Sequence, residues 1–240
     1  MTLNYAHRGA SGYCPENTMS AFIKAIELGC DAIETDVQMT SDGELVLIHD
    51  ETVNRTTNGT GYVKDYDFSS LSKLDAGSWF NSAFHSERIP TAEELIILAK
   101  KNNILINFEI KNNDVKYPGI EEKLINLIKK HAMEHNVILS GFDHYSMVYC
   151  KKICKNIRTA LLYSDTLYKP SEYCRYVCAD AIHPYFKHID KKIISEAHKK
   201  NILVNVYTVN EISDIERLIS WGVDGIITNY PDRGTVHKNQ

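Results

Sequence analysis

The sequence lacks long hydrophobic runs, a strong charge of either sign and an N-terminal leader pattern. No stretch reaches the ~18 consecutive apolar residues of a membrane-spanning helix, and the net charge of -4 offers no basic surface for nucleic acid. The opening MTLNYAHRG has no charged segment followed by an apolar one, as a secretory signal would. We therefore expect a cytoplasmic protein that binds no nucleic acid and has no stable membrane insertion. The sequence leaves its oligomeric state open.

The six cysteines lack the spacing that is typical of a zinc site. Cys150 and Cys154 are four residues apart, as are Cys174 and Cys178, and on a helix this places each pair on one face. A four-thiolate zinc site usually has tighter knuckles with turn glycines. We expect instead small buried apolar groups in a reducing compartment.

Short strand-like runs alternate with amphipathic helical patterns along most of the chain. The predicted strands are residues 3–6, 32–37, 105–110, 137–140, 159–163, 181–183, 203–208 and 225–228. The predicted helices are residues 17–29, a helix that opens with the capping box Thr91-Ala92-Glu93-Glu94, and residues 120–135, 143–155, 171–179, 191–200 and 211–221. This alternation predicts a parallel sheet with helices outside.

Eight such strands in 240 residues predict an α/β fold of the TIM-barrel type, (β/α)8, with residues 1–240 as a single domain. The alternative is an open, doubly wound sheet, which would carry a glycine fingerprint after the first strand. Gly9-Ala10-Ser11-Gly12 does not match that fingerprint. The closed barrel is therefore the favoured architecture.

One segment interrupts the alternation after the second strand. Thr40-Ser41-Asp42-Gly43 is a hairpin signal, and residues 45–48 follow as a short extra strand that ends at His49. Residues 51–88 then show no strong period. A segment this long inside a compact domain is usually functional or a small subdomain. We predict an insertion subdomain that covers the barrel mouth.

Acidic side chains alternate with apolar ones on two predicted strands. Glu34 and Asp36 lie about 6.6 Å apart along one face of the second strand, and Glu109 lies near the end of the third barrel strand. Strand C-terminal ends form the active site of a TIM barrel, so these acids are expected to meet at one mouth. Each acid paired with a lysine or arginine is one interpretation. A shared cation is the favoured one, because buried carboxylates repel each other, and oxygen ligands suit Mg²⁺ or Ca²⁺ better than zinc.

Basic and titratable residues occupy neighbouring strand ends. Arg8 offers a planar fork for two phosphate oxygens, and Lys111 offers a point charge. His7 and His49 are the type of side chain that titrates near neutral pH, as acid–base catalysis requires. Together with a metal, this set indicates phosphoryl transfer. His183 also ends a strand and stays ambiguous, and the other histidines are expected to be structural: His85, His131, His135, His144, His188, His198 and His237.

In order along the chain, these residues resemble the motifs of the glycerophosphodiester phosphodiesterase family. The matching motifs are His7-Arg8-Gly9, Pro15-Glu16-Asn17-Thr18, Glu34-x-Asp36-Val37-x-x-Thr40-x-Asp42-Gly43, His49-Asp50, Glu109-x-Lys111, Ser140-Gly141-Phe142-Asp143 and Thr228-Asn229-Tyr230-Pro231-Asp232. The resemblance covers nearly the whole chain. It implies a TIM barrel with a small insertion at residues 51–88.

The resemblance also implies an activity on a small-molecule phosphodiester. A glycerophosphodiester would be cut to glycerol 3-phosphate and an alcohol after the glycerol 2-hydroxyl attacks phosphorus and forms a cyclic phosphate. The implied site comprises a divalent metal, Mg²⁺ or Ca²⁺, on Glu34, Asp36 and Glu109, acid–base catalysis by His7 and His49, and phosphate binding by Arg8 and Lys111. Which histidine is the acid and which is the base stays open.

Two positions depart from the family pattern. The family often has tryptophan where this chain has Tyr207, which is the predicted stacking partner of the glycerol. The family commonly has aspartate where this chain has Asn229. We expect the first change to affect the fit of the headgroup and the second to make a mild change in charge near the mouth.

Two other functions remain as alternatives. A phospholipase D-like phosphodiesterase that acts on lysophospholipids or sphingomyelin would need an exposed apolar loop, for which Trp79, Phe80 and Phe84 are the candidates. A non-catalytic phosphate-binding barrel would be expected to lack one of the seven predicted metal, acid–base and phosphate residues, and all seven are present. A phosphosugar isomerase or aldolase is disfavoured, because the loops after the last two strands have no glycine to bind phosphate.

Overall fold

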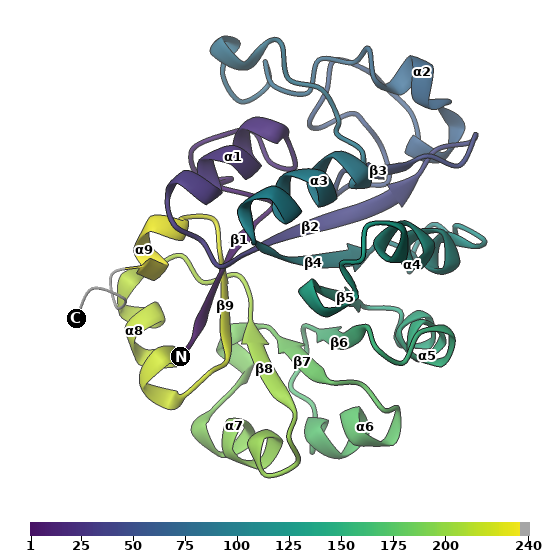
Figure 1. The fold of residues 1–240 in the computed structure, drawn as a ribbon. Helices are drawn as coiled ribbons and strands as arrows, with labels where there is room; N and C mark the ends of the chain where they lie inside the picture. Colours follow the sequence, from purple (N-terminus) through teal and green to yellow (C-terminus); the bar gives the residue numbers. More distant parts are fainter. Residues whose placement is uncertain (236–240) are drawn as a thin grey trace.

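Parallel strands form a closed barrel in the computed structural model, which describes residues 1–235 (Figure 1). Strand β1 pairs with both β9 and β2, so that Tyr5 lies opposite Ile227 on one side and Ala32 on the other. The predicted TIM barrel is confirmed. Within residues 1–235 its eight parallel strands are β1 (Leu3–His7), β2 (Ala32–Met39), β4 (Leu105–Ile110), β5 (Val137–Gly141), β6 (Arg158–Tyr163), β7 (Ala181–Pro184), β8 (Leu203–Val206) and β9 (Gly225–Thr228).

Helices surround the barrel, as the alternation predicts. The predicted capping box of α3 is confirmed: the Thr91 hydroxyl accepts from the Glu94 amide, and the Glu94 carboxylate accepts from the Thr91 amide. The outer helices are α1 (Met19–Glu27), α3 (Ala92–Asn102), α4 (Ile120–Lys130), α5 (His144–Ile153), α6 (Pro170–Tyr176), α7 (Lys191–His198), α8 (Ile212–Trp221) and α9 (Pro231–Thr235).

Several predicted element boundaries were wrong, and three of them have a visible structural reason or consequence. Helix α4 ends at Lys130 and not at residue 135, because the chain turns at Ala132 with a φ of 53° and continues as a 3₁₀ turn, η3 (Glu134–Asn136). Strand β8 ends at Val206, two residues early. Helix α1 is capped by Thr18 and not by Asn17, because the Asn17 side chain is hydrogen-bonded to strand β2 instead.

Apolar side chains fill two concentric layers. One cluster lies between strands and outer helices and includes Ile33, Phe108 and Leu124. A smaller cluster lies inside the barrel and includes Tyr5 and Ile138. Each fully buried side chain of this size contributes about 1.5 to 3 kcal/mol. This rigid frame holds the strand ends in fixed positions around the mouth.

An antiparallel hairpin and a long segment interrupt the barrel pattern. Strand β3 (Leu45–Leu47) pairs with the end of β2 after a turn at Gly43, as predicted. Residues 51–88 then form the short elements η1 (Val63–Asp65), α2 (Phe68–Leu71) and η2 (Ser82–Phe84), near the top of Figure 1. A separate cluster of apolar side chains packs this segment against β3: Val46, Ile48, Val53, Val63, Leu71, Ala76 and Ile89. The subdomain status of the insertion stays a prediction.

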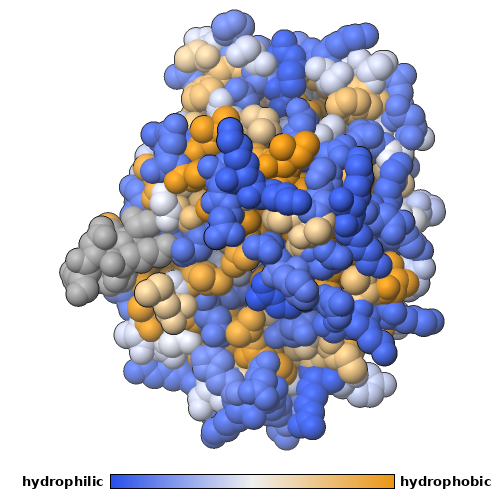
Figure 2. Space-filling model, viewed as in Figure 1, coloured by the Kyte–Doolittle hydropathy of each residue, from blue (hydrophilic) through white to orange (hydrophobic). Residues whose placement is uncertain are grey.

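The surface and the cysteines bear on two further expectations. Hydrophilic residues cover much of the face seen in Figure 2, with hydrophobic patches between them. Within residues 1–235, no helix is long and apolar enough to cross a membrane. The cysteines are free thiols and mostly buried, but Cys178, two residues after the end of α6, is exposed, so the expectation of burial was wrong for this residue.

Candidate active site

A cavity of about 190 Å³ opens among the C-terminal ends of the strands. Strand β1 contributes His7 at its last position and stops there, because Arg8 has a φ of 54° and Gly9 a φ of 78°. A side chain at Gly9 would approach the backbone of Ala21 to 2.6 Å, so the chain can only turn sharply here with glycine. Seven of the eight predicted site residues line the cavity: His7, Arg8, Glu34, His49, Glu109, Lys111 and Tyr207.

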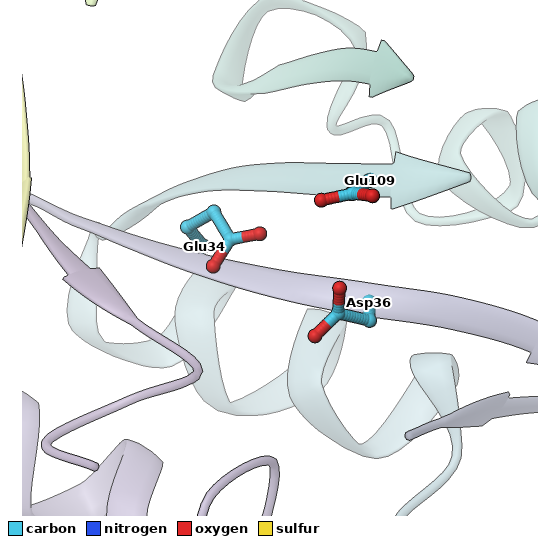
Figure 3. Close-up of side chains that lie close together, drawn as sticks. All are labelled: Glu34, Asp36 and Glu109. Carbon is cyan, nitrogen blue, oxygen red and sulfur yellow. The ribbon is translucent and has the colours of Figure 1, made fainter. Parts of the chain in front are cut away.

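The eighth residue, Asp36, lies just behind the cavity wall in an acidic cluster. Oxygen atoms of Glu34, Asp36 and Glu109 all lie within 4.8 Å of one another. Glu34 and Asp36 come from β2 and Glu109 from β4, and Figure 3 shows the three carboxylates gathered between these strands. The register pairs Asp36 directly with Glu109, so the sheet itself brings the two acids together.

Cationic side chains balance part of this charge. Lys111 donates to Glu109 at 3.1 Å, and Arg8 Nε lies 3.2 Å from Asp36 Oδ2. The interpretation that each acid has its own cation therefore holds for two of the three acids. Burial raises the pKa of Glu34 well above its ordinary value, and the charges of Asp36 and Glu109 raise it further. Burial and the Asp36 charge also raise the pKa of Glu109.

The residues of this cluster fit a divalent metal ion. Asp36 Oδ1 is buried without a hydrogen-bond partner among the described residues, which leaves a lone pair for a ligand. All three acids supply hard oxygen donors of the kind that Mg²⁺ and Ca²⁺ prefer. Burial opposes ionisation of Asp36, but the charges of Arg8, His49 and Lys111 lower its pKa to about 2, so this carboxylate is negative at neutral pH.

The wider charge network also has fewer cations than carboxylates. Among the described residues of this network, five carboxylates meet three cationic side chains. A bound divalent ion would favour the ionised form of all five carboxylates and would then offset their excess of two negative charges. The carboxylates are Glu16, Glu34, Asp36, Asp50 and Glu109, and the cations are Arg8, Arg55 and Lys111.

His7 is held by an amide. Its Nδ1 lies 2.6 Å from Asn229 Oδ1, and since an amide oxygen only accepts, Nδ1 carries the proton. The Nε2 atom then faces Glu34 at 3.9 Å. Burial and the Arg8 charge lower the pKa of His7 to about 4, although the hydrogen bond to Asn229 opposes this shift. The imidazole is therefore neutral at pH 7.

His49 is held by a carboxylate. Its Nδ1 donates to Asp50 Oδ1 at 2.7 Å, and its Nε2 accepts from Lys111 Nζ at 3.3 Å. The adjacent Asp50 thus fixes the ring and its tautomer, as orienting carboxylates do for acid–base histidines. His7 and His49 both line the cavity.

An apolar wall faces these charged groups. Phe142 and Tyr207 meet edge to face, with ring centroids 6.3 Å apart, and Leu162 and Ile227 complete the wall. The Tyr207 hydroxyl donates to the Tyr163 carbonyl at 3.0 Å. The extra hydroxyl of tyrosine is therefore satisfied within the protein, and the ring contributes to the cavity.

Three polar residues of the site lacked an assigned role in the sequence. Asn17 donates to Asp36 Oδ2 at 2.9 Å, Glu16 accepts from Arg8, and Arg55 contacts both Glu16 and Asp50. Glu16 and Asn17 belong to a motif that the resemblance included, so the signal was present. Arg55 lies in the aperiodic insertion, where no pattern marked it.

Of the remaining histidines, one is buried inside the barrel and others lie on its outside. His183 is fully buried inside the barrel, where its Nε2 contacts the Asn205 side chain at 2.9 Å, and burial lowers its pKa to about 3. It does not line the cavity. His144 and His198 are hydrogen-bonded on the outside of the barrel, in keeping with a structural role. His237 lies outside the described residues.

Comparisons with known proteins agree with this geometry. The model of the glycerophosphoryl diester phosphodiesterase family matches residues 7–233. The chain is 47% identical over 231 residues to the glycerophosphodiester phosphodiesterase of Caldanaerobacter subterraneus subsp. tengcongensis, covering 96% of this chain and 95% of that protein. It is 40% identical over 236 residues to that of Bacillus altitudinis, covering 97% and 96%. The structure of an Oleispira antarctica phosphodiesterase in complex with sn-glycerol-3-phosphate matches with a TM-score of 0.88 and 26% identity, covering 98% and 96%.

Proposed function

Since the chain belongs to the glycerophosphoryl diester phosphodiesterase family and is an enzyme of that class, we propose that it uses a divalent metal and two histidines to hydrolyse glycerophosphodiesters. The products are glycerol 3-phosphate and an alcohol. One observation carries the proposal: three carboxylates, two histidines and two phosphate-binding cations meet at one cavity. The product named in the Oleispira structure supports the same substrate class.

The carboxylates of Glu34, Asp36 and Glu109 would hold the metal ion. When bound, a divalent ion neutralises phosphate oxygens and stabilises the charge that develops on them. Arg8 and Lys111 line the same cavity and provide further positive charge that binds the phosphate. The apolar wall with Tyr207 packs against the carbon atoms of the glycerol.

The two histidines transfer the protons. One accepts on Nε2 the proton of the glycerol 2-hydroxyl as its oxygen attacks phosphorus. The other first takes up a proton on Nε2 and then gives it to the departing alkoxide. The five-membered cyclic phosphate that results is opened by water, with the histidines exchanging roles. An intramolecular nucleophile is favourable because its proximity removes much of the entropic barrier. His7 and His49 both line the cavity, and a neighbouring side chain holds Nδ1 of each ring, which supports this assignment.

Release of choline from glycerophosphocholine tests the proposal. We expect activity with added Mg²⁺ or Ca²⁺, loss of activity with EDTA, and recovery on restoring the metal. His49→Ala should lower kcat by about 10²- to 10⁴-fold, the usual contribution of acid–base catalysis. Hydrolysis that persists in EDTA would rule out the metal, and full activity of His49→Ala would rule out its role.

A lysophospholipid substrate is the competing proposal. Trp79, Phe80 and Phe84 form a chain of edge-to-face contacts on the insertion, and the first two are 39% and 37% exposed. If these rings bound lipid, Trp79→Ala would slow hydrolysis of lysophosphatidylcholine and leave glycerophosphocholine unaffected. We expect the diester without an acyl chain to be the better substrate, because the cavity is only about 190 Å³.

A further inference from the structure

Arg55 connects the insertion to two acidic residues of the site. Its Nε and Nη2 donate to the two oxygens of Asp50 at 2.8 and 2.9 Å. Its Nη1 and Nη2 donate to the two oxygens of Glu16 at 2.9 and 2.8 Å. The planar fork of a guanidinium can serve two carboxylates at once, whereas a lysine ammonium cannot match this geometry.

Each of these carboxylates also holds a residue that faces the cavity. Asp50 Oδ1 accepts from His49 Nδ1 at 2.7 Å, and Glu16 Oε1 accepts from Arg8 Nη1 at 2.9 Å. The Nη2 atom of Arg55 contacts these same two oxygen atoms. A single nitrogen therefore links the acid–base histidine to the phosphate-binding arginine through one carboxylate on each side.

We propose that Arg55 is a positioning residue for the hydrolysis. It fixes the position of the His49 ring relative to the phosphate that Arg8 binds. The inference rests on the proposed roles of those two residues. Arg55 does not line the cavity, so it acts through Asp50 and Glu16. It also keeps Glu16 and Asp50 from repelling each other across the rim.

The electrostatic environment of Asp50 supports this role. The hydrogen bond from Arg55 is the main reason why the pKa of Asp50 lies well below its ordinary value. Among the described residues, the charged or titratable side chains that contact Asp50 are His49 and Arg55, with Glu16 on the far side of the guanidinium. Arg55 thus extends the ionised state of Asp50 to more acidic pH than for an ordinary aspartate, and an ionised Asp50 is the acceptor that His49 needs.

Two variants and a control test the inference in the metal-loaded enzyme. Arg55→Met removes the charge and all four hydrogen bonds but keeps an apolar stem, and Arg55→Lys keeps the charge without the planar fork. We expect kcat/KM to fall by about 10- to 100-fold in Arg55→Met, as for other residues that orient a ligand from behind, and by less in Arg55→Lys. The acid limb of the pH profile of kcat/KM should move to higher pH in Arg55→Met, because Asp50 then protonates more readily.

Arg88→Met is the matched control, since Arg88 is also on the insertion and, among the described residues, its side chain donates hydrogen bonds only to the carbonyls of His85 and Glu87. Its activity should stay within twofold of wild type. The side chain of Arg55 is 43% exposed, so its ion pairs contribute little to global stability and the variants are expected to fold. Thermal unfolding measurements show whether the variants fold. If Arg55→Met does not fold, the activity of Arg55→Lys tests the inference.

A double variant separates positioning from a general structural role. Because Arg55 acts partly through Asp50, Arg55→Met combined with Asp50→Ala should lose clearly less activity than the two single losses multiplied together. Additive losses, or an unchanged pH profile in folded Arg55→Met, would overturn the inference. Full activity of His49→Ala would instead overturn the proposed function, whereas an inactive His49→Ala beside a wild-type-like Arg55→Met would remove only the role of Arg55.

Discussion

Asn229 gives His7 a neutral hydrogen-bond partner, which does not offset the burial and the Arg8 charge that keep the imidazole neutral. A carboxylate at the same position would stabilise the protonated ring, whereas an amide oxygen stabilises only the Nδ1 proton. With burial and Arg8 both acting against protonation, the pKa of His7 falls to about 4. His49 has a different hydrogen-bond partner, the carboxylate of Asp50. The two histidines are therefore chemically distinct even though they share one cavity.

Asn229→Asp should raise the pKa of His7 from about 4 toward its ordinary value of 6.5. The introduced carboxylate places a negative charge next to Nδ1 of His7, and this charge favours the imidazolium. An NMR titration of the His7 ring measures the change directly, and the limb of the pH–rate profile that reports His7 should move upward with it. Asn126→Asp, on the exposed face of α4, adds the same charge elsewhere and should leave the titration unchanged. An unshifted His7 in Asn229→Asp would contradict this account.

The regular elements were the part of the fold that the sequence predicted best. Alternation of Glu34 and Asp36 with apolar neighbours reports a local property, the two faces of a strand, and the structure places both acids inside the barrel. The end of β8 was not predictable in this way. Tyr207 continues the apolar pattern, but it lies in irregular chain and pairs with Tyr185 through an isolated bridge. Periodicity does not distinguish a buried strand from a buried turn.

Helix α3 offers a test of stability that is separate from activity. Thr91→Ala removes the hydroxyl that accepts from the Glu94 amide and should lower the free energy of unfolding by about 1 kcal/mol. Thr91→Ser keeps the hydroxyl and should retain most of the stability. Since the capping box does not touch the cavity, kcat/KM should be unchanged in both variants. Urea denaturation measures the stability, and a drop in activity at constant stability would contradict the separation.

At the scale of the whole molecule, the site depends on contacts between residues that are far apart in sequence. His7 and Asn229 are 222 residues apart, and Arg55 meets Glu16 across 39. The predicted acids, histidines and cations could be proposed as one set because a TIM barrel brings its strand ends together. Their partners could not be derived that way. The position of Arg55 follows from how the insertion folds back over β3, which no local pattern encodes.

Closing the barrel also buries acids that repel each other, and this predicts how stability depends on pH and metal. A group whose pKa is raised in the folded state stabilises the fold at any pH below its ordinary pKa. This contribution is lost as the pH rises through the folded-state pKa. Glu34 and Glu109 have raised pKa values, so the metal-free protein should lose stability above about pH 4.5. Asp36, with a pKa of about 2, acts oppositely and only at pH below its ordinary value of 3.8.

Divalent metal should reverse the loss at neutral pH, because it neutralises the ionised carboxylates. At about 100 times its Kd the ion adds about 2.7 kcal/mol, and each kcal/mol raises Tm by about 2 to 4 °C in a chain of this size. Differential scanning calorimetry from pH 4 to 8, with EDTA or with Mg²⁺ or Ca²⁺, measures both effects. Glu34→Gln serves as the matched variant: without metal its Tm should exceed that of the wild type at pH 7, and with metal the order should invert. An equal Tm with and without metal at pH 7 would show that the three acids are stabilised by Arg8 and Lys111 alone.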